Sequence, residues 1–354
     1  MHLPKQSDVV EQQSLVAALL GDGRRLLTLV GLSLVASGGF ALFLAATRQL
    51  LPHDVAYLGV VASQICGASD GRILHFMFHD RAAFGGAVIA TGLLYMWLAE
   101  FPLRQGQAWA WWVLVGSGML GFSSFLAYLG YGYFDVWHAT ATALLLPLFG
   151  LGLARSFPRL RSPRHLRNVR QPSFTGLWQS RAGVGRACLL AMGLGMLLAG
   201  LTIIVVGMTR VFVPQDLQYM NLTVKELMVL SPHLVPLIAH DRAGFGGALA
   251  SCGLALFCCV WCGTPSRSLW QVLALAGGVG FATAIGVHPL IGYTDFSHLA
   301  PAFAGLGLFV GGLWLSYSTM HAGQPVEQAA GERNASLFAH PTSMQQATST
   351  NKAA

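Results

Sequence analysis

The sequence predicts an all-α membrane protein whose eight transmembrane helices form two four-helix repeats. Hydrophobic residues make up 54% of the 354 residues, charged residues only 10%, and the mean hydropathy is +0.56. Soluble domains carry about 25% charged residues, so this composition is typical of a membrane protein. The stretch 79–87 (HDRAAFGGA) recurs almost unchanged as 240–248 (HDRAGFGGA). The chain is therefore expected to have arisen by tandem duplication.

The eight predicted helices follow from apolar runs along the chain. Six runs have about the 20 residues that a helix needs to cross a bilayer, and two more begin at Asp-x-x-His motifs. In chain order they span roughly residues 25–47, 82–99, 108–130, 136–154, 187–209, 243–262, 269–291 and 296–317. The expected domains are an N-terminal segment (1–23), a first repeat (24–156), a basic linker (157–185), a second repeat (186–319) and a disordered tail (320–354).

An even number of helices in each repeat makes the two repeats parallel, with the same orientation in the membrane. Most Lys and Arg residues then lie on the side of the termini and the linker, which the positive-inside rule makes cytoplasmic. We expect a bacterial inner (plasma) membrane, with both termini in the cytoplasm. The net charge of +7 then reflects topology and contact with anionic membrane lipid, and it gives no reason to expect nucleic acid.

The loops after the first and fifth helices, about 25 residues each, are longer than simple connections. We expect amphipathic segments there, covering the exoplasmic end of the bundle. Thr223-x-x-Glu226 has the form of a capping box and predicts a short helix in the second loop.

Most of the non-apolar residues that recur in both halves would lie at the exoplasmic end. An Asp and a His three residues apart project from one face of a helix, where a His from the neighbouring helix could join them. Two imidazoles and one carboxylate suit zinc or non-haem iron. The predicted metal ligands are His79, Asp135 and His138 in the first half, and His240, Asp295 and His298 in the second.

The same region also carries recurring charges that suit ion pairs or an anionic substrate. In the structural alternative, Asp80 caps a helix amino terminus and Arg81 pairs with a carboxylate such as Asp54. The residues of this set are Arg48, Asp54, Asp80 and Arg81 in the first half, and Arg210, Asp216, Asp241 and Arg242 in the second.

Two further features bear on the site. His75 and His288 have no histidine counterpart in the other half, and each is a candidate extra ligand. The Phe-Gly-Gly sequence after each His-Asp-Arg is typical of close helix packing, which we expect to bring His79 toward the helix that carries His138.

Three function classes remain open at this point. The favoured one is a membrane metalloenzyme acting on a lipid-like or anionic substrate. The second is a non-catalytic protein that binds a lipid or partner and uses the cluster as an ion-pair and capping network. The third is a transporter, which is less favoured because the other halves of the helices have few ionisable groups. Haem is disfavoured, because the histidines lie at a single membrane boundary.

Overall fold

The computed structural model describes residues 21–60, 62–161 and 179–322 and is helical throughout its regular structure. Within these residues, eight helices are long and apolar enough to cross a membrane, as predicted. Most of the predicted tail, of the N-terminal segment and of the linker lies outside the described residues, and α16 extends to His321, two residues into the predicted tail. The membrane helices are α3 (Arg24–Thr47), α6 (Arg72–Glu100), α7 (Ala108–Ser123, continued by η1, Ser124–Ala127, and α8, Tyr128–Tyr131), α9 (Val136–Ser156, followed by η2, Phe157–Arg159), α11 (Arg181–Thr209), α14 (Leu234–Cys262), α15 (Arg267–Ile291) and α16 (Phe296–His321).

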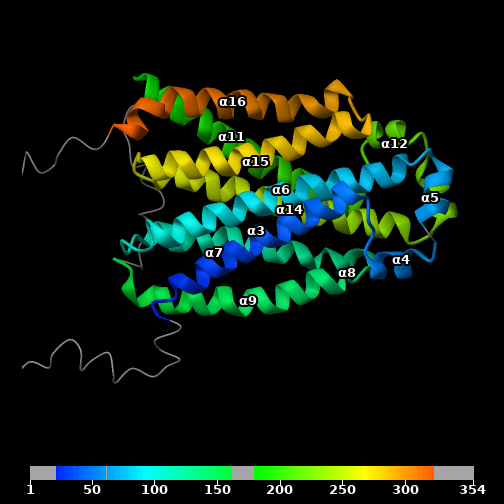
Figure 1. Ribbon diagram of the computed structural model, residues 1–354, viewed down its shortest axis with the longest axis horizontal. Helices are drawn as coiled ribbons and strands as arrows, with labels where there is room; N and C mark the ends of the chain where they lie inside the picture. The colour runs from blue at the N-terminus through cyan, green and yellow to red at the C-terminus, as the bar shows by residue number, and fades with distance from the viewer. Residues whose placement is uncertain (1–20, 61, 162–178, 323–354) are drawn as a thin grey trace, which may run out of the picture.

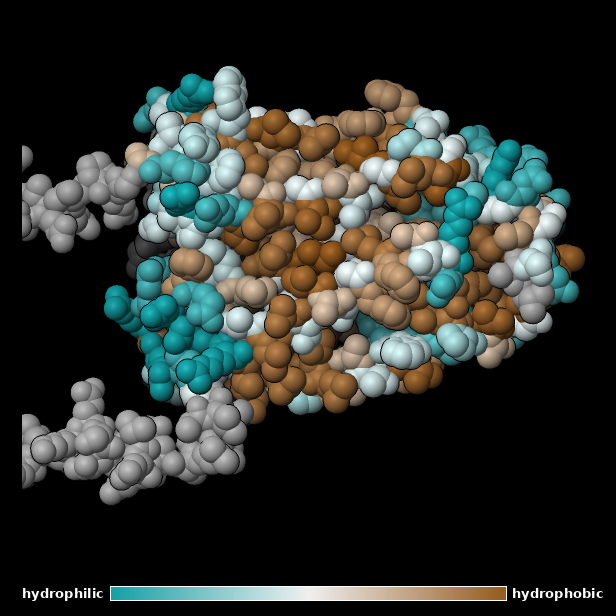
Figure 2. Space-filling model, in the orientation of Figure 1, coloured by the Kyte–Doolittle hydropathy of each residue, from teal (hydrophilic) through white to brown (hydrophobic). Residues whose placement is uncertain are grey.

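Helices α6 and α14 form the centre of the bundle (Figure 1). Of an 18-residue apolar stretch in each helix, 78% is buried in α6 and 67% in α14, whereas only 17–28% is buried in the other six helices. The surface of the bundle is apolar across its middle and polar at both ends (Figure 2). An apolar belt of this kind suits a hydrocarbon environment, whereas the two central helices are shielded from it by their neighbours.

Two adjacent glycines determine which helices α6 contacts. A Cβ atom on Gly85 would lie 2.8 Å from the carbonyl oxygen of Gly38 on α3, in the same half of the chain. A Cβ atom on Gly86 would overlap the side chain of Thr283 on α15, in the other half. Small residues allow such close approach of helix backbones in lipid. Helix α6 is thus packed between its own half and the other half.

Helix α14 makes the corresponding contacts, with the roles of the two halves exchanged. A Cβ atom on Gly246 would lie 2.7 Å from the carbonyl oxygen of Gly200 on α11, in the same half. A Cβ atom on Gly247 would overlap Ser124 in η1, which belongs to the first half. The Phe-Gly-Gly sequences therefore hold the central helices close to the third membrane helix of the opposite half.

Short helices lie at the end of the bundle opposite the start of α3 and the end of α16 (Figure 1), and we call them the loop cap: α4 (Pro52–Leu58), α5 (Ala62–Ala68), α12 (Pro214–Met220) and α13 (Val224–Leu230). Thr223 caps the start of α13: its hydroxyl accepts from the backbone N–H of Glu226, while the Glu226 carboxylate accepts from the backbone N–H of Thr223. These reciprocal bonds satisfy donors at the start of the helix.

The central helices begin earlier than the hydropathy pattern predicts. Helix α6 starts at Arg72 rather than near residue 82, and α14 starts at Leu234 rather than near residue 243. The residues His79-Asp80-Arg81 therefore lie inside α6, and Asp80 is not an amino-terminal cap as the structural alternative assumed. The helix extends through this polar stretch because its side chains find partners in the bundle and the loop cap.

Candidate metal sites and the ion-pair network

Each central helix contributes an arginine that joins two carboxylates. The Arg81 NH2 group lies 2.7 Å from Asp54 Oδ2 in α4, and its Nε lies 3.1 Å from Asp241 Oδ2 in α14. The pairing of Arg81 with Asp54 is the one that the sequence suggested. The contact with Asp241 joins the two halves of the chain.

Arg242 on α14 makes the reciprocal set of contacts. Its NH2 lies 2.8 Å from Asp216 Oδ2 in α12, and its Nε lies 3.3 Å from Asp80 Oδ2 in α6. Its NH1 donates to the carbonyl oxygen of Val211 at 2.8 Å. The two pairs Arg81–Asp241 and Arg242–Asp80 therefore cross between the central helices.

This network is buried and holds more negative than positive charge. The exposed fractions of Asp54, Asp80 and Asp216 are 1%, 3% and 0%. Each guanidinium lies between two carboxylates, so with neutral histidines each half of the network has one excess negative charge. Buried charge of this kind needs a compensating partner, and a bound cation beside it would supply one.

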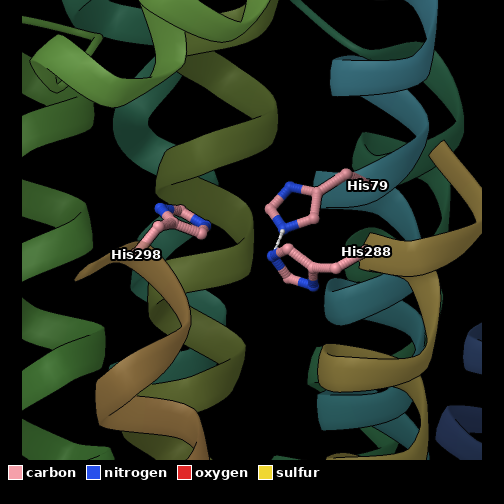
Figure 3. A group of neighbouring side chains, drawn as sticks. All are labelled: His79, His288 and His298. Atoms are coloured by element: carbon pink, nitrogen blue, oxygen red, sulfur yellow. Dashed lines mark hydrogen bonds between the residues drawn. The ribbon is translucent and has the colours of Figure 1, made fainter. Parts of the chain in front are cut away.

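Three histidines from both halves converge at one side of the network (Figure 3). His79 comes from α6, His288 from α15 and His298 from α16. The Nε2 atoms of His79 and His288 lie 3.0 Å apart, and the ring centroids of His288 and His298 are 5.3 Å apart. One nitrogen of each ring lies within 4.8 Å of the others. We call these residues the tri-histidine site.

Hydrogen bonds to the other ring nitrogens orient these imidazoles. The Nδ1 atom of His79 lies 3.0 Å from Asp80 Oδ1, a bond in which Nδ1–H donates to the carboxylate. The Tyr293 hydroxyl donates to Asp216 Oδ1 at 2.9 Å and so accepts from Nδ1 of His298 at 3.2 Å. In both histidines this assignment leaves Nε2 unprotonated, with a lone pair for a ligand.

The second group contains Asp135, His138 and His240, again with ligand atoms within 4.8 Å of one another. We call it the His/Asp site. His240 Nδ1 lies 3.3 Å from Asp241 Oδ1, matching the bond between His79 and Asp80. Its Nε2 atom is buried and has no hydrogen-bond partner among the described residues. A buried nitrogen without a partner is costly, and metal ligation would satisfy it.

Both sets of side chains fit a metal ion in kind and in spacing. Nitrogen ligands about 2.0–2.1 Å from a tetrahedral zinc are roughly 3.3 Å apart, close to the separation of the facing nitrogens in the tri-histidine site. Three histidines leave a fourth position of zinc open, and two histidines with a carboxylate form the set that non-haem iron uses. Carboxylates bonded to the outer ring nitrogen are the usual support for such histidines.

The combination of ligands differs from the one expected within each half. His79 lies with His288 and His298, and His240 lies with Asp135 and His138. The physical reason is that Gly86 and Gly247 pack against the opposite half of the chain. Each central helix therefore lies away from the fourth helix of its own half.

The remaining predicted residues have more local roles. Asp135 and Asp295 cap α9 and α16 by accepting backbone N–H groups through Oδ1. Asp295 belongs to neither group of ligands among the described residues, and hydrogen bonds from Ser297 and His298 lower its pKa. Arg48 and Arg210 are exposed at the ends of α3 and α11, and no ion pair of theirs is found in the described part of the chain.

Sequence reasoning gave too little weight to several residues. His288 was only a candidate extra ligand, yet it faces His79 directly, whereas His75 lies outside both ligand groups. His53 Nε2 lies 3.1 Å from Asp135 Oδ1. Tyr133 donates to Asp54 as Tyr293 does to Asp216. The sequence signal for these two tyrosines is the motif Gly-Tyr-x-Asp-x-x-His, which occurs at 132–138 and again at 292–298.

The tri-histidine site opens into a large apolar cavity. It has a volume of about 670 Å³ and lies between α6, α11, α14, α15 and α16. A smaller cavity of about 120 Å³ lies beside His138 of the His/Asp site.

Comparison of the chain with protein-family models, curated proteins and solved structures gives no match.

Proposed function

We propose that this protein is a membrane metalloenzyme with two metal sites, one in each group of ligands. The observation that carries the proposal is the same in both groups. The histidine of each His-Asp-Arg sequence bonds through Nδ1 to the adjacent aspartate and directs Nε2 toward ligands from the other half. A purely structural network would not require two converging sets of ligand atoms.

Zinc is the metal we assign to the tri-histidine site, and zinc or non-haem iron to the His/Asp site. A metal with an open position polarises a bound oxygen or activates water. The residues of the chain would hold the ion, keep its histidines in the required tautomer and exclude bulk water. The cavity beside the tri-histidine site makes it the better candidate for binding a substrate.

The proposal extends to topology. Two parallel repeats with cytoplasmic termini would put the loop cap and both sites at the exoplasmic end of a bacterial inner membrane. The repeated sequence 79–87 and 240–248 supports this arrangement, as does the correspondence between the contacts of Arg81 and Arg242.

A second candidate is a non-catalytic protein in which the cluster only stabilises the bundle. The four Arg–Asp pairs of Arg81 and Arg242 favour it, because they join the loop cap to both central helices. The two functions are compatible within one structure, since the ion pairs and the ligand nitrogens belong to different side chains.

Metal content separates the candidates. The whole chain purified in detergent would be analysed by mass spectrometry for zinc, iron and copper, together with His138→Ala, His298→Ala and the double variant. We expect up to two equivalents, with one lost in each single variant and both in the double. His321→Ala, at the opposite end of α16, is the matched control and should retain both. Folded native protein without metal after reconstitution would refute the metalloenzyme and leave the structural function.

A further inference from the structure

The cavity beside the tri-histidine site is long and mostly apolar, with its histidines and charged side chains at one end. His79, His288 and His298 line it at the end nearest the loop cap, and Ala90 on α6 lines it farther along. At about 1.5 Å per residue, the stretch from His79 to Ala90 is roughly 16 Å. Small and aliphatic side chains form most of the remaining wall. The shape suits an extended hydrocarbon chain with its polar end at the histidines.

The charged groups at this end are already paired. Arg242 lines the cavity, but its Nε, NH1 and NH2 contact Asp80, the carbonyl oxygen of Val211 and Asp216. Arg81 lines neither of the two cavities. In the metal-free site, an anionic head group would therefore meet no unpaired cation among the described residues that line the cavity, and it would lie beside excess carboxylate. A neutral, oxygen-bearing head group avoids this repulsion.

The corresponding cavity of the first half is much smaller, at about 120 Å³ against about 670 Å³. Tyr95 and Leu145 line the small cavity, and the residues at the equivalent positions of the repeat are Leu256 and Gly305 in the large one. Bulkier side chains thus occupy the space in the first half. The asymmetry indicates one chain-binding site rather than two.

Exposed residues of α11 and α16 form part of the cavity wall. Helices α11 and α16 are in close contact near the end of the bundle far from the loop cap, where a Cβ atom on Gly185 would lie 2.9 Å from the carbonyl oxygen of Gly312. They separate toward the loop cap (Figure 1). Thr202 on α11 and Ala304 on α16 line the cavity and remain exposed. A lipid chain could enter between these helices without crossing the polar ends of the bundle.

We infer that the cavity binds the hydrocarbon chain of a neutral lipid whose oxygen-bearing head lies at the tri-histidine site. Ligation of that oxygen rests on the proposed metal function, whereas binding of the chain depends only on the cavity. The reaction substrate of the proposed enzyme would then be a long-chain alcohol, ester or related neutral lipid. Of the lipid-like or anionic substrates expected from the sequence, the inference thus selects a neutral lipid.

Binding of radiolabelled hexadecanol to the whole chain in phosphatidylcholine nanodiscs tests the inference, with hexadecyl phosphate as the anionic comparison. Gly305→Leu introduces the residue that lines the small cavity and should weaken hexadecanol binding by about tenfold, the loss expected when roughly two methylene groups lose their burial. Gly307→Leu is the matched control, because Gly307 has no atom within 4 Å of its Cβ position, and it should bind normally. Ala199→Leu, from the opposite wall, serves as a second cavity variant if Gly305→Leu fails to fold.

Each result has a defined meaning. Saturable binding of about one hexadecanol per chain, weakened in a folded cavity variant and stronger than binding of the phosphate, supports the inference. Absence of saturable binding, equal binding by the cavity variants, or preference for the phosphate overturns it. The assay is repeated on chelator-treated protein. Retained chain binding in protein that never takes up metal would refute the proposed metal function alone, and metal binding without chain binding would refute this inference alone.

Discussion

The Nε2 atom of His79 lies 3.0 Å from the Nε2 atom of His288, although the two residues belong to different halves of the chain. Two imidazole nitrogens at this distance either share a proton or bind a common ion. Because Nδ1 of His79 is bonded to Asp80, the proton of a neutral His79 is already used there. The lone pair of His79 thus faces His288 and is available to a metal.

Replacing the supporting aspartate should affect one site more than the other. Asp80→Asn removes the carboxylate that accepts from His79, so we expect a loss of about 10–100-fold in metal affinity at the tri-histidine site. Asp241→Asn is the matched change for His240 and the His/Asp site. Chelator competition on metal-loaded protein measures both affinities. If either variant lowered the metal affinity of both sites equally, the idea that each aspartate supports only its own site would be contradicted.

The ion-pair network should make a large contribution to stability. Arg81→Met leaves the buried Asp54 and the largely buried Asp241 without their common partner, and breaking a buried pair costs about 3–5 kcal/mol. The midpoint of denaturant unfolding in detergent measures this loss. Arg48→Met is the control, because Arg48 is exposed, and its effect should stay within about 0.5 kcal/mol. Similar midpoints for the two variants would show that the buried pairs are not needed.

A single methyl group at the contact between the halves should disturb the tri-histidine site. A Cβ atom on Gly86 overlaps Thr283, so Gly86→Ala forces α15 away from α6 and should cost about 1–3 kcal/mol. Because α15 carries His288, metal affinity at the tri-histidine site should fall as well. Gly278→Ala, on α15 with no atom within 4 Å of its Cβ position, should change neither quantity. Unaltered metal affinity in folded Gly86→Ala protein would argue against this packing as the determinant of the site.

The two motif tyrosines should make the protein sensitive to high pH. Burial, reinforced by the neighbouring carboxylates, raises the pKa of Tyr133 beside Asp54 and of Tyr293 beside Asp216 above the ordinary value of about 10. Their contribution to stability is complete below about pH 10 and is lost as the pH rises toward the folded-state pKa. The decline in unfolding free energy above about pH 10 should flatten in Tyr133→Phe/Tyr293→Phe. An identical pH dependence in the double variant would rule out this linkage.

The sequence was sufficient to predict the eight membrane helices, because length and hydropathy determine that property locally. It also identified most of the side chains in the two ligand groups, since His79, His138, His240 and His298 belong to repeated motifs. It did not reveal that His79 meets His288 and His298. That pairing depends on how Gly86 and Thr283 pack between the halves, which no local pattern encodes.

Cavity size is another property that could not be predicted from the motifs. The positions of Tyr95 and Leu145 in the first half correspond to Leu256 and Gly305 in the second, but these substitutions suggest a cavity only when the surrounding helices are known. Packing in the membrane depends on how closely whole helices approach each other. Helices α11 and α16, for example, touch at Gly185 and Gly312 and separate toward the loop cap (Figure 1), and no sequence motif predicts this separation.

Metal counting in paired double variants tests most directly whether each site is shared between the halves. His79→Ala/His298→Ala removes two ligands of the tri-histidine site, so the protein should retain about one equivalent, bound at the His/Asp site. His79→Ala/His138→Ala removes one ligand from each site and should bind no metal. Both variants lose two imidazoles, so general destabilisation would affect them alike. The opposite result, with metal retained only in His79→Ala/His138→Ala, would show that the ligands pair within each half and would contradict the shared sites.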